Sequence, residues 1–510
     1  MKNKQGILIL LIILLGVIYR LTLSSNGNFI FNMDNSRDMV DVREMVILGK
    51  LRLIGPSSAI EGFYNGPFWY YLLGIPFFIS GGNPYASILM EIILWAVGGF
   101  FLLKLVSRWG ILSIAMVGCI WVASNFILLA SQYAFNPNPV IFLTPVLIYL
   151  LERYLEKNEL VVSIFLWLLA GLFLHFEMAA GIFIPPVILT SIYLINRKLL
   201  YKKIFWIGFL FYFLLLLPQL LFEIKHNFIM TKSVMTYLTK VSSSGQSYNL
   251  LERVRTISLS YYDTLLPTFM NFKLFTSSLL LLFFAALFIQ LKQGIKKMDQ
   301  LFLLNTLLIT ISFTGFVLLP INVNRWHFDA VVVASIFITG FIIKSLADYG
   351  KSGKFAGLGI IITLLIFSLL NVKNYFSALK VPSNDPANFK NEISSIDFVY
   401  QKAEGKNFKV YTYLPSVYDY PYQYLFWWHG LKKYGFVPED YSYAPDKPQY
   451  ISGKEKLKTG NSPESSGFIF LIKQPDQEGR RHLWENEFKK MELISTEKIG
   501  PNELEIRKEI

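Results

Sequence analysis

The densest group of charged residues lies between residues 34 and 44, directly after the first apolar segment. Four of these residues stand three and four positions apart, so a helix would place them on one face. They are Asp34, Arg37, Asp38 and Asp41. A carboxylate held beside a cation can act as a general base. The same spacing fits a solvent-exposed row of ion pairs without a catalytic role, so spacing alone leaves both interpretations open.

Three further polar groups interrupt apolar stretches of the chain. They are FNPNP at Phe135–Pro139, HFE at His175–Glu177 and NRWHFD at Asn324–Asp329. A charge in the middle of a bilayer costs about 2.5–3.5 kcal/mol on insertion scales, so such groups rarely face lipid. We therefore expect them to lie in loops at one membrane surface, where the chemistry would take place.

The composition is typical of a polytopic membrane protein. Of the 510 residues, 53% are hydrophobic and only 16% are charged, and the mean hydropathy is +0.44. The net charge of +13 could indicate nucleic-acid binding. However, Lys and Arg gather in short loops between apolar stretches, which favours orientation in a bilayer and no nucleic-acid partner. The single cysteine, Cys119, excludes a disulfide framework and a Cys-based metal site.

Eleven segments have the length and apolarity of membrane spans, which need about 20 residues. They lie near 7–23, 84–104, 110–131, 138–151, 161–174, 178–196, 203–223, 272–291, 299–319, 328–347 and 355–373. The apolar segment 66–80 is short and contains two prolines. If it lies along the membrane surface, every inside loop becomes basic, as the positive-inside rule requires. This topology predicts a multi-pass membrane protein with a cytoplasmic N-terminus.

The predicted outer face receives the loops 24–83 and 225–271 and the segment 375–510, called here the tail. The tail is polar and rich in Tyr, and it is long enough for one small domain. Its pattern predicts a helix near 387–403 and a helical stretch at 483–490, with strands at 408–414, 467–473 and 492–499. The predicted fold is a polytopic α-helical membrane module, 1–374, with about eleven transmembrane helices and a small C-terminal extracytoplasmic α/β domain, 375–510.

The order of several motifs resembles a known family. After the acidic cluster comes Glu61–Tyr71 (EGFYNGPFWYY), then Ser131–Pro139 (SQYAFNPNP), Gly171–Glu177 (GLFLHFE), Arg325–His327 and, in the tail, Gln423–Gly430 (QYLFWWHG). This series resembles the GT-C membrane glycosyltransferases. It is most similar to bacterial glycosyltransferase family 39, whose relatives include protein O-mannosyltransferases and lipid A aminoarabinose transferases.

The resemblance implies a polyprenyl-phosphate-linked sugar donor and an acidic residue in the first outer loop. Carried over by position, Asp34 is the expected catalytic base. Many relatives have Asp-Glu at this point, whereas this chain has Asp34-Asn35. This departure leaves open whether Asp38 shares or takes the role of Asp34.

The donor phosphate needs cations or hydrogen-bond donors directed at the charge that develops as it leaves. Arg325 is the first candidate because a guanidinium can bind two phosphate oxygens. His327 and Arg37 are the other expected phosphate or lipid ligands. The alternative for Arg325 and His327 is a pair of side chains that reach to the membrane interface without contacting substrate.

Substrate contacts are expected from side chains in three outer loops: Tyr64, Trp69, Asn136, His175 and Glu177. Each has a structural alternative. Asn136 could cap the following helix, and His175 and Glu177 could pack or cap within the helix pair. No cofactor is required, although carboxylates such as Asp34, Asp38 and Glu177 could share a divalent metal.

The sequence therefore predicts an inverting hexosyl or pentosyl transferase of the membrane. It would move a sugar from a polyprenyl-phosphate donor to a lipid, glycan or protein acceptor on the extracytoplasmic face. A transporter or flippase of a lipid-linked saccharide is one alternative, but transporters commonly show repeats and midplane charges. A non-catalytic scaffold is the other alternative, because fold similarity alone does not establish activity.

Overall fold

The computed structural model describes residues 2–243, 249–445, 451, 453–457, 463–476 and 479–508. It divides into two compact units, each assembled from three stretches of chain. Unit 1 contains Met1–Arg20, Arg52–Trp69 and Glu91–Asn374, and Unit 2 contains Leu21–Leu51, Tyr70–Met90 and Tyr375–Ile510. Much of the first predicted outer loop therefore groups with the tail. The division into a membrane module and an extracytoplasmic domain stays a prediction.

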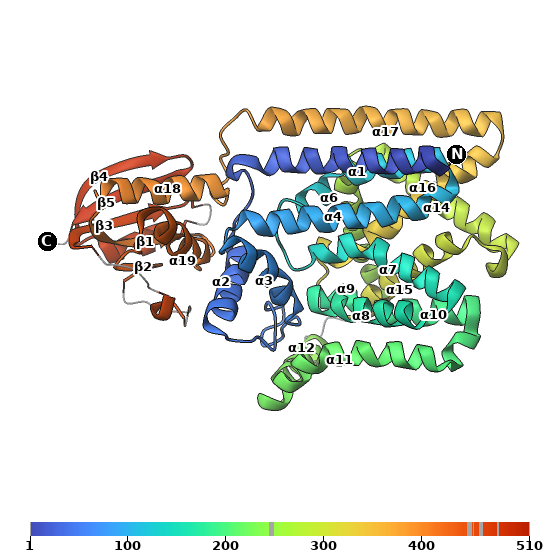
Figure 1. Cartoon of the computed structure of the whole chain (residues 1–510), viewed down its shortest axis with the longest axis horizontal. Helices are drawn as coiled ribbons and strands as arrows, with labels where there is room; N and C mark the ends of the chain where they lie inside the picture. Colours follow the sequence, from blue (N-terminus) through green and yellow to red (C-terminus); the bar gives the residue numbers. More distant parts are fainter. Residues whose placement is uncertain are drawn as a thin grey trace. The chain divides into compact units, whose positions relative to one another are not determined.

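Unit 1 is built from apolar helices (Figure 1). Its helices, three of which extend into Unit 2, are α1 (Lys2–Ser24), α4 (Tyr85–Val106), α5 (Ile111–Ala123), α6 (Asn125–Ala130), α7 (Asn138–Lys157), α8 (Leu160–Phe176), α9 (Met178–Gly181), α10 (Ile184–Asn196), α11 (Lys203–Lys225), α12 (Ile229–Ser243), α13 (Leu250–Thr268), α14 (Lys273–Gln293), α15 (Gln300–Leu318), α16 (Asp329–Asp348) and α17 (Lys351–Ala378). Every predicted span corresponds to helical structure. Eight spans in the described part of the chain are long and apolar enough to cross a membrane. The number of eleven spans stays a prediction.

Two predicted spans are interrupted. The segment predicted at 110–131 breaks at Ser124, whose hydroxyl accepts a hydrogen bond from the Ile127 amide at 3.3 Å and so caps α6. The segment predicted at 178–196 breaks between α9 and α10, and α10 begins with two prolines at positions suited to a helix start. Polar or proline residues therefore set both interruptions within otherwise apolar sequence.

The close packing of α8 against α11 fixes the helix whose end carries HFE. At Gly208 a Cβ atom would lie 2.2 Å from the Ser163 hydroxyl oxygen, so only a glycine lets the two backbones approach this closely. Trp167 of α8 packs edge-on against Phe209 of α11, with ring centroids 4.7 Å apart. These contacts hold the end of α8 at a defined position in Unit 1.

Unit 2 contains a five-stranded sheet with the order β2-β1-β3-β5-β4. The strands are β1 (Asn407–Tyr413), β2 (Asp440–Ser442), β3 (Ser465–Lys473), β4 (Glu492–Ile499) and β5 (Asn502–Lys508). β1 is parallel to β2 and β3, whereas β5 is antiparallel to β3 and β4. Helix α18 (Phe389–Lys402) packs against β4 and β5 (Figure 1). The expected small α/β domain is confirmed, and β2 and β5 are additional strands.

The remaining helices of Unit 2 lie in the first loop and beside the sheet. They are α2 (Met33–Leu48), α3 (Phe68–Ser80, which begins in Unit 1), α19 (Tyr420–Leu425), the π-helix η6 (Phe426–Tyr434) and α20 (Arg481–Glu485). Asn32 caps the start of α2 by accepting from the Asp34 amide at 3.0 Å, and Gly49 in the left-handed conformation caps its end. α2 packs against α19, so this part of the first loop and the tail belong to one folded body.

Candidate active site

The charged face predicted for the first loop exists on α2. The Arg37 guanidinium lies between two carboxylates: Nη1 is 3.2 Å from Asp34 Oδ1, and Nε and Nη2 are 3.0 and 2.8 Å from Asp38 Oδ1. The Asp38 side chain is fully buried, whereas 34% of the Asp34 side chain is exposed. Asp38 therefore serves to hold Arg37, and Asp34 is the carboxylate that an incoming molecule can reach.

The charge state of this cluster follows from its contacts. Burial alone would lower the pKa of Arg37, but the adjacent Asp38 and Asp34 carboxylates outweigh it and raise that pKa. Arg37 therefore stays charged at any working pH. On the same face, Asp41 accepts a hydrogen bond from the Tyr70 hydroxyl at 3.0 Å. Burial and the nearby carboxylate raise the pKa of Tyr70, so its hydroxyl remains a donor.

In Unit 1 the structure brings together the predicted GPF and HFE motifs. His175 is fully buried, and a Cβ atom built on Gly66 would overlap its Nδ1 at 1.5 Å. The Phe68 ring meets the His175 ring edge-on, with centroids 4.7 Å apart. The Asn65 side chain accepts from the Met178 amide at 3.3 Å. These contacts explain why glycine stands at position 66, and they give His175 a packing environment.

The FNPNP motif joins the same region. The Asn136 amide group donates to the Phe176 carbonyl at 2.6 Å, beside Glu177. Phe135 meets Trp326 edge-on at 5.8 Å between ring centroids, and Trp326 is partly exposed. Asn136 therefore fixes the position of the HFE backbone. Its predicted contact with substrate stays a prediction.

Glu177, His327 and Asp329 form a group of interacting titratable side chains in Unit 1. His327 Nδ1 accepts from the Asn324 amide at 3.2 Å, so in the neutral ring Nε2 carries the proton and lies 3.8 Å from Glu177 Oε1. Glu177 also caps α9 through the Ala179 amide at 3.2 Å. Burial raises the pKa of Glu177 to about 7. Asp329 is 1% exposed, and neither of its carboxylate oxygens has a hydrogen-bond partner in the described structure.

The other predicted residues of Unit 1 differ in accessibility. Arg325 is exposed at the start of the short helix before α16, as a phosphate ligand would need to be. Tyr64 is half-buried and lies edge-on to Phe222, with centroids 6.0 Å apart. Trp69 is fully buried, so a contact with substrate would require movement of its neighbours. The assigned substrate and phosphate roles all stay predictions.

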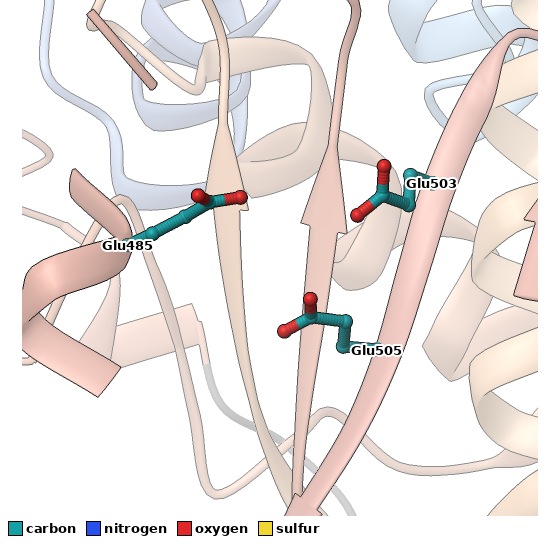
Figure 2. Close-up of side chains that lie close together, drawn as sticks. All are labelled: Glu485, Glu503 and Glu505. Carbon is teal, nitrogen blue, oxygen red and sulfur yellow. The ribbon is translucent and has the colours of Figure 1, made fainter. Parts of the chain in front are cut away.

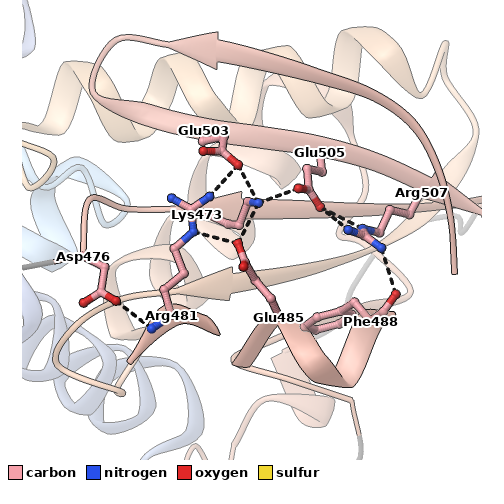
Figure 3. Close-up of polar contacts among 8 residues, drawn as sticks. All are labelled: Lys473, Asp476, Arg481, Glu485, Phe488, Glu503, Glu505 and Arg507. Atoms are coloured by element: carbon pink, nitrogen blue, oxygen red, sulfur yellow. Dashed lines mark hydrogen bonds and ion pairs between the residues drawn. The ribbon is translucent and has the colours of Figure 1, made fainter. Parts of the chain in front are cut away.

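Three carboxylates in the tail come close enough to suggest a metal site. Figure 2 shows the side chains of Glu485, Glu503 and Glu505, which are the one group within the described residues with ligand atoms near enough to hold an ion. Figure 3 shows what neutralises them: Lys473 Nζ lies 3.0 Å from Glu485, 2.6 Å from Glu503 and 2.5 Å from Glu505. The Lys473 side chain is 2% exposed. The Lys473 ammonium occupies the position that a metal ion would take between the carboxylates, so the group is a structural ion-pair network.

Comparison with known structures gives the fold. ArnT from Cupriavidus metallidurans bound to undecaprenyl phosphate superimposes with a TM-score of 0.61 at 10% sequence identity, covering 98% of this chain and 97% of that chain. The apo structure of the same ArnT gives a TM-score of 0.56 at 12% identity, again covering 98% and 97%. This chain has the GT-C glycosyltransferase fold.

A family model supports the same relationship from the sequence side. Residues 65–222 match the family described as dolichyl-phosphate-mannose-protein mannosyltransferase. A search of curated proteins found no match. The GT-C resemblance predicted from the order of motifs is therefore confirmed, and the chain is a multi-pass membrane protein.

The structure also shows residues that sequence reasoning did not assign. Asp329 lay within a predicted motif but received no role. An acid in the first turn of a helix is common, and it is its burial that sets Asp329 apart. Asn65 and Gly66 belong to the quoted aromatic run, and only the folded chain shows that they contact Met178 and His175. Their partners stand more than a hundred residues away in sequence.

Proposed function

We propose that this protein transfers a sugar from a polyprenyl-phosphate donor to a hydroxyl group of a lipid, glycan or protein. The observation that carries the proposal is the state of Asp34: a partly exposed carboxylate, fixed by Arg37, in the first turn of a capped helix. The similar ArnT is described as bound to undecaprenyl phosphate. The matching family is described by a dolichyl-phosphate sugar. Both are polyprenyl phosphates, which supports a donor of this class.

In the proposed reaction Asp34 removes the proton from the acceptor hydroxyl. The acceptor oxygen then bonds to the anomeric carbon as the bond from that carbon to the phosphate oxygen breaks. Attack opposite to the leaving phosphate inverts the configuration at the anomeric carbon. Arg37 orients Asp34 through the 3.2 Å contact and leaves the second carboxylate oxygen, Oδ2, for the acceptor.

The leaving phosphate needs stabilisation by donors already in place. We assign this role to the exposed Arg325 and to the Nε2–H of His327, with Glu177 and Asn136 supporting the loop that faces them. The basic loops predicted on the inside support a cytoplasmic N-terminus and an active site on the extracytoplasmic face of the plasma membrane. Labelling of single cysteines placed at residues 34 and 198 of a Cys119→Ser variant by a membrane-impermeant reagent tests that orientation.

The decisive experiment compares wild type, Asp34→Asn and Asp38→Asn in liposomes supplied with a panel of radiolabelled undecaprenyl-phosphate sugars. Transfer or slow donor hydrolysis that is lost in Asp34→Asn supports the enzyme and its base. Loss confined to Asp38→Asn moves the base by one helical turn. If no donor turns over but labelled lipid changes leaflet in all three proteins, the protein is a transporter and the proposal is wrong.

A further inference from the structure

The N-terminal end of α2 is attached to the tail. Two backbone hydrogen bonds join the chain before α2 to the start of α18: the Phe31 amide to the Ala387 carbonyl at 2.8 Å and the Phe389 amide to the Phe29 carbonyl at 2.9 Å. The Phe29 and Phe389 rings stack with centroids 4.7 Å apart. The residue that caps α2 therefore follows directly after a segment held by the tail.

The C-terminal end of α2 is attached to the tail at a second place. Glu44 is 3% exposed, and its Oε1 accepts from the Gly453 amide at 2.9 Å while its Oε2 lies 3.0 Å from Lys50 Nζ. A Cβ atom on Gly453 would lie 2.8 Å from Glu44 Oε1 and 2.9 Å from the Leu48 side chain. The tail backbone therefore approaches α2 as closely as its atoms allow.

Between these two attachments a buried cation fixes the rotation of the helix. Arg43 is 1% exposed, and its guanidinium carbon lies 5.0 Å from the centre of the Trp427 ring, in the π-helix of the tail. Arg43 follows Asp34 by nine residues, which is about two and a half helical turns. The two side chains therefore point to opposite faces of α2. A helix held by Arg43 on one face presents Asp34 on the other.

From these three attachments we infer that the tail orients the catalytic helix, and that Glu44 and Arg43 are positioning residues for Asp34. The inference rests on the proposed role of Asp34 as the base, and it gives the tail a function that does not require it to bind substrate. Both ends of α2 and its rotation are defined by contacts with residues 387–453.

The expected effect on catalysis follows from the sensitivity of proton transfer to geometry. A displacement of about 1 Å from the productive arrangement can cost on the order of 100-fold in rate. Loss of the Glu44–Gly453 hydrogen bond would free the last turns of α2 and let Asp34 move relative to a bound acceptor. Donor binding does not use Glu44, so the donor KM should not change.

The test compares Glu44→Ala with Glu44→Gln in the full chain. The glutamine keeps an oxygen that can accept from the Gly453 amide, whereas alanine removes it. Glu497→Ala, an exposed change on β4, is the matched control. Two quantities are measured: hydrogen exchange of the α2 backbone, and turnover of radiolabelled undecaprenyl-phosphate sugar in liposomes.

We expect at least tenfold faster exchange in α2 and a 10- to 100-fold lower kcat for Glu44→Ala, with the donor KM unchanged. Glu44→Gln should restore both quantities to within about threefold of wild type, and Glu497→Ala should match wild type. Unchanged exchange of α2 in Glu44→Ala overturns the positioning role. Equal loss of protection in β3 and β5 also overturns it, because the effect is then a general loss of structure. Turnover retained in Asp34→Asn overturns the proposed base instead, so the two failures are read separately.

Discussion

Two charged clusters in Unit 2 differ in how completely cations neutralise their carboxylates. On α2 one cation, Arg37, contacts two carboxylates, and one of these, Asp34, keeps a third of its side chain exposed. In the tail one cation, Lys473, contacts three carboxylates and is itself buried (Figure 3). Each of the three tail carboxylates also contacts a second cation, Arg481 or Arg507, whereas the α2 cluster leaves one carboxylate oxygen for another molecule. Glu485 and Glu503 are about as exposed as Asp34, so the number of cations around each carboxylate, and not accessibility, distinguishes the two clusters.

The largest effect should come from Asp34→Asn. General-base catalysis contributes about 10²- to 10⁴-fold, so we expect kcat to fall by that factor. The donor KM and the thermal stability should change little, because Asp34 is partly exposed. Turnover of undecaprenyl-phosphate sugar in liposomes, with a thermal melt of the same samples, provides the check. A variant with wild-type kcat would place the α2 cluster in the same structural class as the Lys473 network.

Lys473→Met should destabilise the tail without changing the rate of the reaction in folded molecules. The cost should be about 1.5–3 kcal/mol, the usual contribution of hydrogen bonds to charged groups, because Arg481 and Arg507 still pair with the three carboxylates. Denaturant unfolding followed through hydrogen exchange of β3 and β5 measures the loss. The kcat per folded molecule should stay near that of wild type at low temperature. Replacement of the exposed Lys498 by Met is the matched control and should have little effect.

In its effects on stability and kcat, Asp38→Asn should resemble Lys473→Met more closely than it resembles Asp34→Asn. The amide keeps one oxygen for Arg37 but loses its charge, and hydrogen bonds to charged groups contribute about 1.5–3 kcal/mol. We expect lower stability of α2, measured by hydrogen exchange, and a smaller fall in kcat than for Asp34→Asn. A greater loss of kcat in Asp38→Asn than in Asp34→Asn would contradict the assignment of the base.

Acid should weaken the tail cluster. Burial would raise the pKa of Glu485 and Glu503, but contacts with Lys473 and Arg481 outweigh it and lower both values. A carboxylate whose pKa is lowered by folding stabilises the folded state at pH values above its unfolded-state pKa of about 4.3. This stabilisation is lost as the pH falls through the folded-state pKa. Exchange of β3 and β5 should therefore accelerate below about pH 4 relative to the intrinsic rate. Lys473→Met should show a weaker dependence.

Chelation should have the smallest effect. Arg37 already supplies the positive charge between Asp34 and Asp38, so we expect kcat to stay within about twofold after EDTA treatment. A loss that Mg²⁺ or Mn²⁺ restores would show that a divalent ion takes part, as the sequence alone allowed. Measurement at constant ionic strength separates this effect from salt screening.

The sequence predicted the helices of Unit 1 because long apolar runs have few alternatives to a membrane span. In the tail it predicted β1 and β3 from strand-like composition and β4 from alternation. It did not predict β2, which has three residues, or β5, where charged residues alternate with only two large apolar ones. The acidic face of α2 followed from spacing. The buried state of Asp38 and the unpartnered Asp329 depend on neighbours far apart in sequence, which periodicity does not encode.

The attachments of α2 also set an order of events during synthesis. Asn28 bonds a residue 360 positions later, and Glu44 bonds one 409 positions later. At roughly 5–20 residues per second, the ribosome needs on the order of 20–80 seconds between making α2 and making its partners. Throughout that interval the chain lacks the partners that fix α2, so a nascent protein would not yet hold Asp34 in the orientation proposed for catalysis. The proposed orientation of α2 would therefore be reached only after the last quarter of the chain has been synthesised and has bonded to it.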